Sequence, residues 1–247
     1  MRSPLLLPVL LLAAGCFDFS GPDEGTDVGN PDLIAWPQSL ELEPACPGGV
    51  RRASLLLENR SRWDVDAMAG GTRGVEAYPS AFEVDGHGSS ELAVVIHVPE
   101  TTAGRVSGLI VVRHRREGAS EESDPLHVPW SADVVPGGAE ATVLCGGVLP
   151  CDAIDFGPVF TGAVWARPID VVNDGCAPLR VERVVAEGSE VEVAGPALPR
   201  TLQPGERWAG TLRLDPASAG TRQGTVVVET DDPARPQRQI GWTAAVR

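Results

Sequence analysis

The sequence contains no lysine: all 20 of its basic residues are arginines, set against 34 acidic residues for a net charge of −14. Schiff-base catalysis and a lysine-bearing phosphate loop are therefore excluded. The acidic balance also argues against a nucleic acid as partner, because nucleic acids attract clustered positive charge. Aromatic residues make up only 5% of the chain, and no segment repeats its apolar residues every 3.6 positions as an amphipathic helix does.

Glycine and proline, in contrast, are abundant, with 28 and 22 copies. Together they form about a fifth of the chain, which favours many short strands and turns over long helices. Hydrophobic residues, at 43%, suffice for a packed core, so the chain is not disordered as a whole. Its 247 residues predict one or two domains.

The amino terminus, MRSPLLLPVLLLAAGC, combines a positive start with a short apolar run, Leu5–Leu12. The run is far shorter than the ~20 residues that span a bilayer, so it predicts a signal peptide, residues 1–15, and not an anchor helix. The string LAAGC ending at Cys16 resembles the lipobox of bacterial lipoproteins. The resemblance implies a diacylglycerol on the thiol of Cys16 and, because Phe17 follows, a place in the outer membrane. An ordinary secretory signal whose cleavage precedes a cysteine is the alternative.

Residues 16–32 are rich in glycine, proline and acidic residues and have no hydrophobic periodicity. This composition predicts a flexible tether with a root-mean-square reach of about 20–25 Å, enough to hold a domain clear of lipid head groups. The acidic residues do not have the spacing of an EF-hand, so we predict a solvated linker and no calcium site.

The remainder of the chain contains an internal repeat. The segments Leu92–Val112 and Trp208–Val228 align without gaps at a constant offset of 116, which superimposes two glycines of each. Near the end of each copy, Trp130 matches Trp242. We expect these tryptophans to occupy equivalent places in the core or at its rim.

Apolar and polar residues alternate within each copy, in runs bounded by glycine, proline and aspartate. This period of two is typical of half-buried antiparallel strands. The second copy has about seven such runs in roughly 100 residues, the size of an immunoglobulin-like β-sandwich. We therefore predict an all-β protein with two tandem immunoglobulin-like sandwiches, residues 33–136 and 150–247, joined by a linker, residues 137–149.

The second copy resembles a known family. Its motifs are IDFGPV from Ile154, VVNDG from Val171, PLRV from Pro178, LQPG from Leu202, LDP from Leu214 and DDP from Asp231. They follow the pattern of the abnormal-spindle/hydin (ASH) domain, whose bacterial copies are called choice-of-anchor D repeats and whose fold is related to PapD-like domains. The resemblance covers residues 150–247, and the first copy departs from it at Trp63. It implies binding or scaffolding roles, which a fold alone does not fix.

Two of these motifs predict turns. In VVNDG, Asn173 and Gly175 can adopt positive φ and close a tight turn between strands. In LQPG, Pro204 presets φ for a turn, and Gly205 supplies the conformational freedom that the next position needs.

Four cysteines follow Cys16, and they are Cys46, Cys145, Cys151 and Cys176. An even number in an exported chain predicts two disulfides, with three possible pairings. We favour Cys151–Cys176, which would link the start of the second copy to its VVNDGC turn, and hence Cys46–Cys145. Zinc is the alternative, but there is no CxxC pair and the CGGVLPC spacing has no nearby histidines, so we expect no metal.

Motifs that carry catalysis are missing from the sequence. It has no GxSxG elbow, phosphate loop, dinucleotide fingerprint or histidine pair with metal-ligand spacing. Nothing singles out a carboxylate pair among the many acids. We predict that the protein is not an enzyme and uses no cofactor. Trp63, set among arginines in RSRWD, is the candidate for an exposed interface residue.

These features together predict a lipid-anchored, non-catalytic binding, adhesion or scaffolding module of the bacterial cell envelope. Its partners would be the membrane, through the lipid, and an envelope or extracellular protein or polysaccharide. A cell-envelope hydrolase and a periplasmic assembly factor of chaperone type are the alternatives. A hydrolase requires a pocket with converging acids, and a chaperone requires an accessible edge strand.

Overall fold

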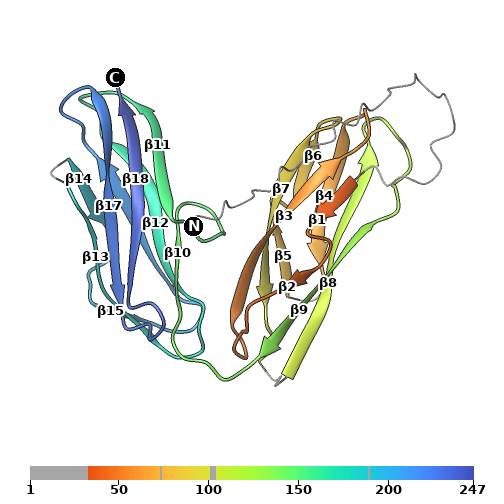
Figure 1. The fold of residues 1–247 in the computed structure, drawn as a ribbon, viewed down its shortest axis with the longest axis horizontal. Coiled ribbons are helices and arrows are strands. Elements are labelled where there is room, and N and C mark those ends of the chain that lie inside the picture. Colours follow the sequence, from red (N-terminus) through yellow and green to blue (C-terminus); the bar gives the residue numbers. More distant parts are fainter. Residues whose placement is uncertain (1–32, 73, 101–103, 189) are drawn as a thin grey trace, which may run out of the picture. The chain divides into compact units, whose positions relative to one another are not determined.

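The structure of the protein is a computed structural model that describes residues 33–72, 74–100, 104–188 and 190–247. These residues belong to one compact unit, Pro31–Arg247, and form two β-sandwiches in succession (Figure 1). The fold is all-β, as the alternating pattern predicts. In the described part of the chain, no helix is long and apolar enough to cross a membrane.

Sandwich 1 consists of two sheets. The order of the first sheet is β1 (Leu33–Trp36), β3 (Val50–Asn59), β7 (Ser89–His97) and β5 (Val75–Tyr78). The order of the second is β2 (Leu40–Glu41), β9 (Leu126–Val134), β8 (Gly104–Arg116), β4 (Val65–Gly71) and β6 (Ala81–Val84).

Sandwich 2 repeats this order strand by strand. Its first sheet contains β10 (Ala141–Leu144), β12 (Trp165–Asn173), β16 (Arg207–Leu214) and β14 (Val191–Ala194). Its second sheet contains β11 (Ala153–Val159), β18 (Gln237–Val246), β17 (Gly220–Thr230), β13 (Leu179–Ala186) and β15 (Arg200–Leu202). Every strand lies where its counterpart nine strands earlier lies in sandwich 1, so the two sandwiches are structural repeats.

The strands differ from the sequence expectation in two respects. Sandwich 2 includes β10, which lies in the segment 137–149 expected to be a linker, and β15. All four side chains of β10 are buried, so it shows no alternation that the sequence could reveal. The strands β2 and β11 also pair in parallel with β9 and β18, whereas the alternating pattern predicts antiparallel strands.

Each sandwich has its own hydrophobic core between its two sheets. In β16, for example, Trp208, Gly210, Leu212 and Leu214 are buried on one side, and the residues that alternate with them are exposed or half-buried. Burial of each such side chain contributes roughly 1.5–3 kcal/mol. Among the described residues, every member of the cores lies between Leu33 and Val246, so a chain that begins at Pro31 contains all of them.

The strand register shows where the gapless alignment of the repeat fails. In sandwich 1, Leu57 pairs with Ser90, and at the corresponding place in sandwich 2, Val171 pairs with Trp208. Trp208 is therefore the counterpart of Ser90. The constant offset of 116 would instead match Trp208 with Leu92, two residues further along the chain. The inward face is preserved because a shift of two residues leaves every side chain on the same side of the sheet.

A size exchange accompanies this shift. The ring of Trp208 lies over Gly210, where a β-carbon would come within 2.3 Å of it. In sandwich 1 the counterparts are the small Ser90 and the buried Leu92. Each sandwich therefore has one large and one small residue at these two core positions. The large residue comes first in sandwich 2 and second in sandwich 1.

Candidate functional site

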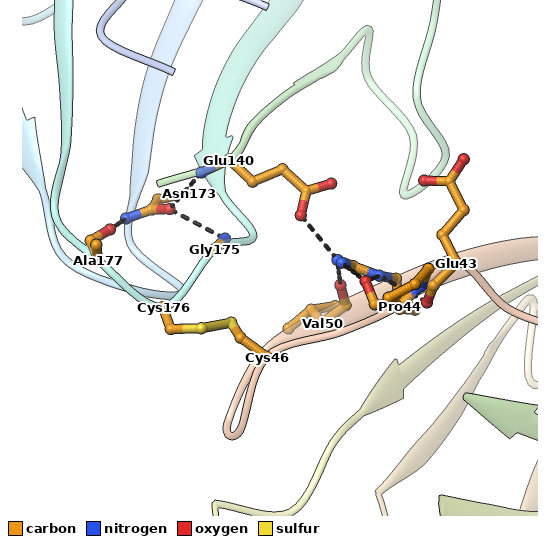
Figure 2. The surroundings of a disulfide bond; sticks show 10 residues. Glu43, Pro44, Cys46, Val50, Glu140, Asn173, Gly175, Cys176 and Ala177 are labelled. Carbon is orange, nitrogen blue, oxygen red and sulfur yellow. Dashed lines mark hydrogen bonds and ion pairs between the residues drawn. A yellow bond between two sulfur atoms is a disulfide. The ribbon is translucent and has the colours of Figure 1, made fainter. Parts of the chain in front are cut away.

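The two sandwiches are joined by a disulfide between Cys46 and Cys176, which lie 130 positions apart in the sequence with Cα atoms 5.8 Å apart (Figure 2). Cys46 lies in the loop between β2 and β3, and Cys176 lies in the turn between β12 and β13. The chain also passes from sandwich 1 to sandwich 2 through residues 135–140, between β9 and β10. The disulfide is therefore a second covalent connection, and this junction is the candidate functional site.

Asn173 organises the turn that carries Cys176. It is fully buried at the last position of β12. Its Nδ2 donates to the carbonyl oxygens of Ala177 at 2.8 Å and Leu202 at 3.0 Å, and its Oδ1 accepts from the backbone N–H of Gly175 at 3.1 Å. The side chain thus satisfies backbone groups that the turn takes out of the sheet.

The positive φ predicted for Asn173 and Gly175 is wrong, since neither belongs to the positive-φ residues of the described chain. Hydrogen bonds from the asparagine side chain shape the turn instead, and Asn59 makes the same kind of bond to the carbonyl of Trp63 in sandwich 1. The turn predicted at LQPG is confirmed, because Gly205 has a φ of 77°.

The linker packs directly on the Cys176 turn. The backbone N–H of Asp174 donates to the carbonyl of Glu140 at 2.9 Å, and that of Cys176 donates to the carbonyl of Gly138 at 3.0 Å. A β-carbon on Gly175 would come within 2.3 Å of the Gly138 oxygen. Gly175 therefore allows the backbone of the turn to approach the backbone of Gly138 closely. It is not needed here for an unusual φ.

Two consecutive arginines of β3 reach the connection between the sandwiches and the Cys176 turn of sandwich 2. Their side chains leave opposite faces of the strand and meet different acids. Arg52 forms an ion pair with Asp174, in which the two side chains are only 11% and 4% exposed. Arg51 pairs with Glu140 at 3.0 Å and donates from Nε to the carbonyl of Pro44 at 3.1 Å.

The Arg52–Asp174 pair is buried and only partly satisfied. Arg52 Nε and Asp174 Oδ1 have no hydrogen-bond partner among the described residues. Removing one member of such a pair leaves an uncompensated charge and typically costs roughly 3–5 kcal/mol. We therefore interpret the pair as a contact that favours this packing of β3 against the Cys176 turn over alternative packings, in which the two charges would be buried without a partner.

A cleft of about 800 Å³ lies beside the disulfide. Its charged lining consists of Arg51, Arg52, Arg235, Arg238, Glu43, Glu140, Asp152 and Asp232. Asp232 is buried and accepts hydrogen bonds from the backbone N–H groups of Ala141 at 2.9 Å and Ala234 at 2.8 Å, so it holds the first strand of sandwich 2 in place. A lining of both charge signs is chemically suited to hydrogen bonding with polar groups of a partner.

The four cysteines form two disulfides, as expected, but the favoured pairing is wrong. Cys145 is bonded to Cys151, six residues later, with a Cα–Cα separation of 5.8 Å. The expected Cys151–Cys176 and Cys46–Cys145 bonds are absent because Cys145 and Cys151 close a short loop after β10, while Cys176 meets the loop of sandwich 1. Sequence separation could not reveal this pairing, since it depends on which loops of two sandwiches meet.

The other two predicted site residues lie away from the junction. Cys16 falls outside the residues that the structure describes. Trp63 lies in the turn after β3 and is 51% exposed, with the guanidinium of Arg62 4.8 Å from its ring centre. Its position is that of an accessible aromatic residue, and the turn that carries it is the sandwich 1 counterpart of the Cys176 turn.

Three acids of sandwich 1 come together without any signal in the sequence. The carboxylates of Asp64, Glu83 and Glu117 place oxygen atoms within 4.8 Å of one another. Loss of surrounding water, followed by the negative charges of Asp64 and Glu117, raises the pKa of Glu83 above its usual 4.5. The three carboxylates of the cluster thus repel one another. They lie close together because β4 pairs with both β6 and β8.

Comparison with known proteins finds no matching family and no matching curated protein. Among solved structures, the chain is similar to a protein of unknown function from Porphyromonas gingivalis, with 16% identity, coverage of 87% of this chain and 100% of that one, and a TM-score of 0.37. It is similar to an ASH/PapD-like domain of human CEP192, with 13% identity over 48% of this chain and 97% of that one, and a TM-score of 0.38. It is also similar to the E. coli chaperone DraB, with 14% identity over 85% and 96% and a TM-score of 0.35. Because these TM-scores are low, the fold assignment rests on the strand order itself.

Proposed function

We propose that the protein is a non-catalytic binding or scaffolding module of the bacterial cell envelope, held at the outer membrane by a lipid on Cys16. The tether of residues 16–32 would confine two covalently joined sandwiches to a surface and raise their effective concentration toward neighbouring partners. Those partners would be envelope or extracellular proteins or polysaccharides.

The observation that carries this proposal is the bonding of all four cysteines after Cys16 in two disulfides. Disulfides persist in oxidising compartments and are rare in the reducing cytosol. Complete pairing therefore supports export, which the apolar start and the LAAGC string also favour. The lipid would be attached to Cys16, the cysteine of the LAAGC string.

The charged groups at the junction support binding more than catalysis. Asp174, Glu140 and Asp232 are each engaged by an arginine or by backbone N–H groups. Such contacts hold the strands and loops of the junction in place. Two sandwiches that are joined covalently offer a partner a surface that is already ordered. Binding to such a surface loses less conformational entropy.

The test is a detergent phase-partitioning experiment on cells that produce the full chain with a labelled fatty acid. We expect the wild-type protein in the detergent phase with label attached, and Cys16→Ala in the aqueous phase without label. The matched control, Cys145→Ala/Cys151→Ala, should still partition with the detergent. An unlabelled wild-type protein in the aqueous phase would contradict the lipid anchor.

Crosslinking in the same intact cells tests the binding role. We expect a reproducible crosslinked partner for the wild-type protein, reduced for Cys16→Ala because the membrane no longer concentrates it. A wild-type protein that crosslinks to no other macromolecule would remove the support for a binding module.

A further inference from the structure

The parallel pairings of the two sandwiches establish which of their loops are equivalent. In sandwich 1, Ala45 bridges to Val134, and in sandwich 2, Val159 pairs with Val246 in the same way. The backbone hydrogen bonds agree, since the residue after Val134 donates to Ala45 and the residue after Val246 donates to Val159. Phe160 is therefore the counterpart of Cys46, the residue that is bonded to sandwich 2.

Each sandwich thus has two distinct ends. We call residues 46–49 and 160–164, which precede β3 and β12, the leading loops, and residues 60–64 and 174–178, which follow those strands, the trailing turns. A strand of nine or ten residues separates the two, about 30 Å at 3.3 Å per residue. Leading loop and trailing turn therefore lie at opposite ends of their own sandwich.

Within one chain, the leading loop of sandwich 1 is bonded to the trailing turn of sandwich 2 through Cys46 and Cys176. Among the described residues, the leading loop of sandwich 2 and the trailing turn of sandwich 1 have no disulfide to the other sandwich. The chain therefore carries one bonded and one unbonded copy of each of these two ends, and the unbonded copies contain no cysteine.

The unbonded leading loop is apolar and exposed. Phe160 and Val164 are 56% and 54% exposed. The ring of Phe160 lies against that of Trp165, with centroids 6.3 Å apart, and Trp165 Nε1 donates to the carbonyl of Phe160 at 3.2 Å. The loop is thus an ordered aromatic tip, and exposed aromatic residues held in place are typical centres of protein interfaces.

The unbonded trailing turn offers matching chemistry. Trp63 is 51% exposed, and Arg62 lies over its ring. Arg60 of the same turn is paired with Glu58 at 3.4 Å, and the stretch from Phe156 to Ala166 contains no charged residue. The Arg62 side chain can stack on an aromatic ring of the loop without like-charge repulsion, even though the chain as a whole is acidic.

We propose that the protein associates with a second copy of itself, head to tail, through the leading loop of sandwich 2 in one chain and the trailing turn of sandwich 1 in the next. The contact continues between chains the junction that Cys46 and Cys176 form within one. It is heterologous, so it produces open chains or rings and not a symmetric dimer. The inference goes beyond the proposed function and does not depend on it.

Two loops bury little surface, so the association is weak, roughly micromolar or weaker. The experiment is sedimentation equilibrium of the segment Pro31–Arg247 with its disulfides formed, over a concentration series that reaches the high micromolar range. This segment contains both cores and is free of the lipid, which would bring chains together by itself. We expect a weight-average mass that rises continuously with concentration beyond that of a dimer.

Three variants show which surfaces are responsible. Phe160→Ser/Val164→Ser removes the leading-loop contact, and Trp63→Ser removes the trailing-turn contact, so each alone should remain monomeric. Met68→Ser, which replaces a side chain that is 65% exposed elsewhere on sandwich 1, is the control and should associate like the wild type.

A mixture of the two single-end variants is the decisive step. Each variant retains the end that the other has lost, so the mixture should form a one-to-one complex and nothing larger. A wild-type protein that stays monomeric at every concentration would overturn the proposal. So would variants that self-associate as the wild type does, or a mixture that remains monomeric.

Discussion

The indole of Trp242 covers Gly224, its direct partner on the neighbouring strand, and a β-carbon on that glycine would lie 2.7 Å from Nε1 of the indole. Sandwich 1 contains the same arrangement, with Trp130 over Gly108 and again 2.7 Å to Nε1. Both tryptophans are buried, as their matching positions in the repeat predict. Each glycine therefore makes room for a tryptophan of the core.

Replacing Gly224 by alanine should destabilise sandwich 2. The added methyl group forces the Trp242 ring out of its place, and such overpacking typically costs roughly 1–3 kcal/mol. Urea unfolding followed by tryptophan fluorescence measures the loss. Gly70→Ala is the matched control, because no atom lies within 4 Å of its added carbon, and its stability should be unchanged or slightly higher. Equal effects of the two substitutions would contradict this account of the glycine.

Asn173→Ala should destabilise the junction turn. The carbonyl groups of Ala177 and Leu202 lose their donor, and the N–H of Gly175 loses its acceptor. Leaving buried polar groups unsatisfied costs roughly 1–3 kcal/mol, so the unfolding midpoint should fall accordingly. Asn59→Ala should have a comparable effect on sandwich 1, and an unchanged midpoint in both variants would rule out the structural role of these asparagines.

The two disulfides should differ in what they stabilise. Cys46 and Cys176 close a loop of about 130 residues, worth about 5 kcal/mol in the chain-entropy model, whereas the six-residue loop of Cys145 and Cys151 is worth about 2 kcal/mol. Thermal unfolding of Cys46→Ser/Cys176→Ser and Cys145→Ser/Cys151→Ser measures the difference. Proteolysis of the linker at residues 135–140 should accelerate in the first variant, and an equal rate in both would contradict a clamp at the junction.

The pH dependence of stability should separate Glu206 from Glu83. A hydrogen bond from the N–H of Gln203, followed by the Arg200 guanidinium, lowers the pKa of Glu206 below 4.5. Its stabilising effect is therefore complete above pH 4.5 and disappears as the pH falls through the lowered value. The pKa of Glu83 is raised above 4.5, so its ionised form lowers the stability of the folded protein at neutral pH. This destabilisation disappears on acidification, when Glu83 takes up a proton.

The measurement is the unfolding midpoint of Glu206→Gln and Glu83→Gln from neutral to acidic pH. Glu206→Gln should lower the midpoint at neutral pH, and Glu83→Gln should raise it. The Glu83→Gln difference should shrink as the pH falls toward 4.5, and the Glu206→Gln difference should shrink only as the pH falls below 4.5. Changes of the same sign in the two variants would show that these local charges are not responsible.

The sequence was sufficient for the all-β fold and the repeat, because alternation and the paired tryptophans are local signals. It could not reveal β10, whose four residues are all buried, or the two-residue shift that places Trp208 on Ser90. A shift by two leaves the face of every residue unchanged, so only hydrogen-bond register distinguishes it.

The junction was beyond the reach of the sequence for a different reason. The candidates Cys46 and Cys176 could be named, but their bond depends on loops that are remote in the chain. The ion pairs of Arg51 and Arg52 depend on the same meeting of loops. The acids around Glu83 are separated by long stretches of chain, and no spacing rule brings them together.

Disulfide mapping tests the covalent junction most directly. No acidic residue lies between Cys145 and Cys151, so a protease that cuts after glutamate and aspartate leaves both in one fragment, apart from those of Cys46 and Cys176. Digestion of the unreduced, unfolded protein and mass spectrometry should find the Cys46 fragment bonded to the Cys176 fragment, with the Cys145–Cys151 fragment separate. A single species that joins all three fragments would contradict the junction.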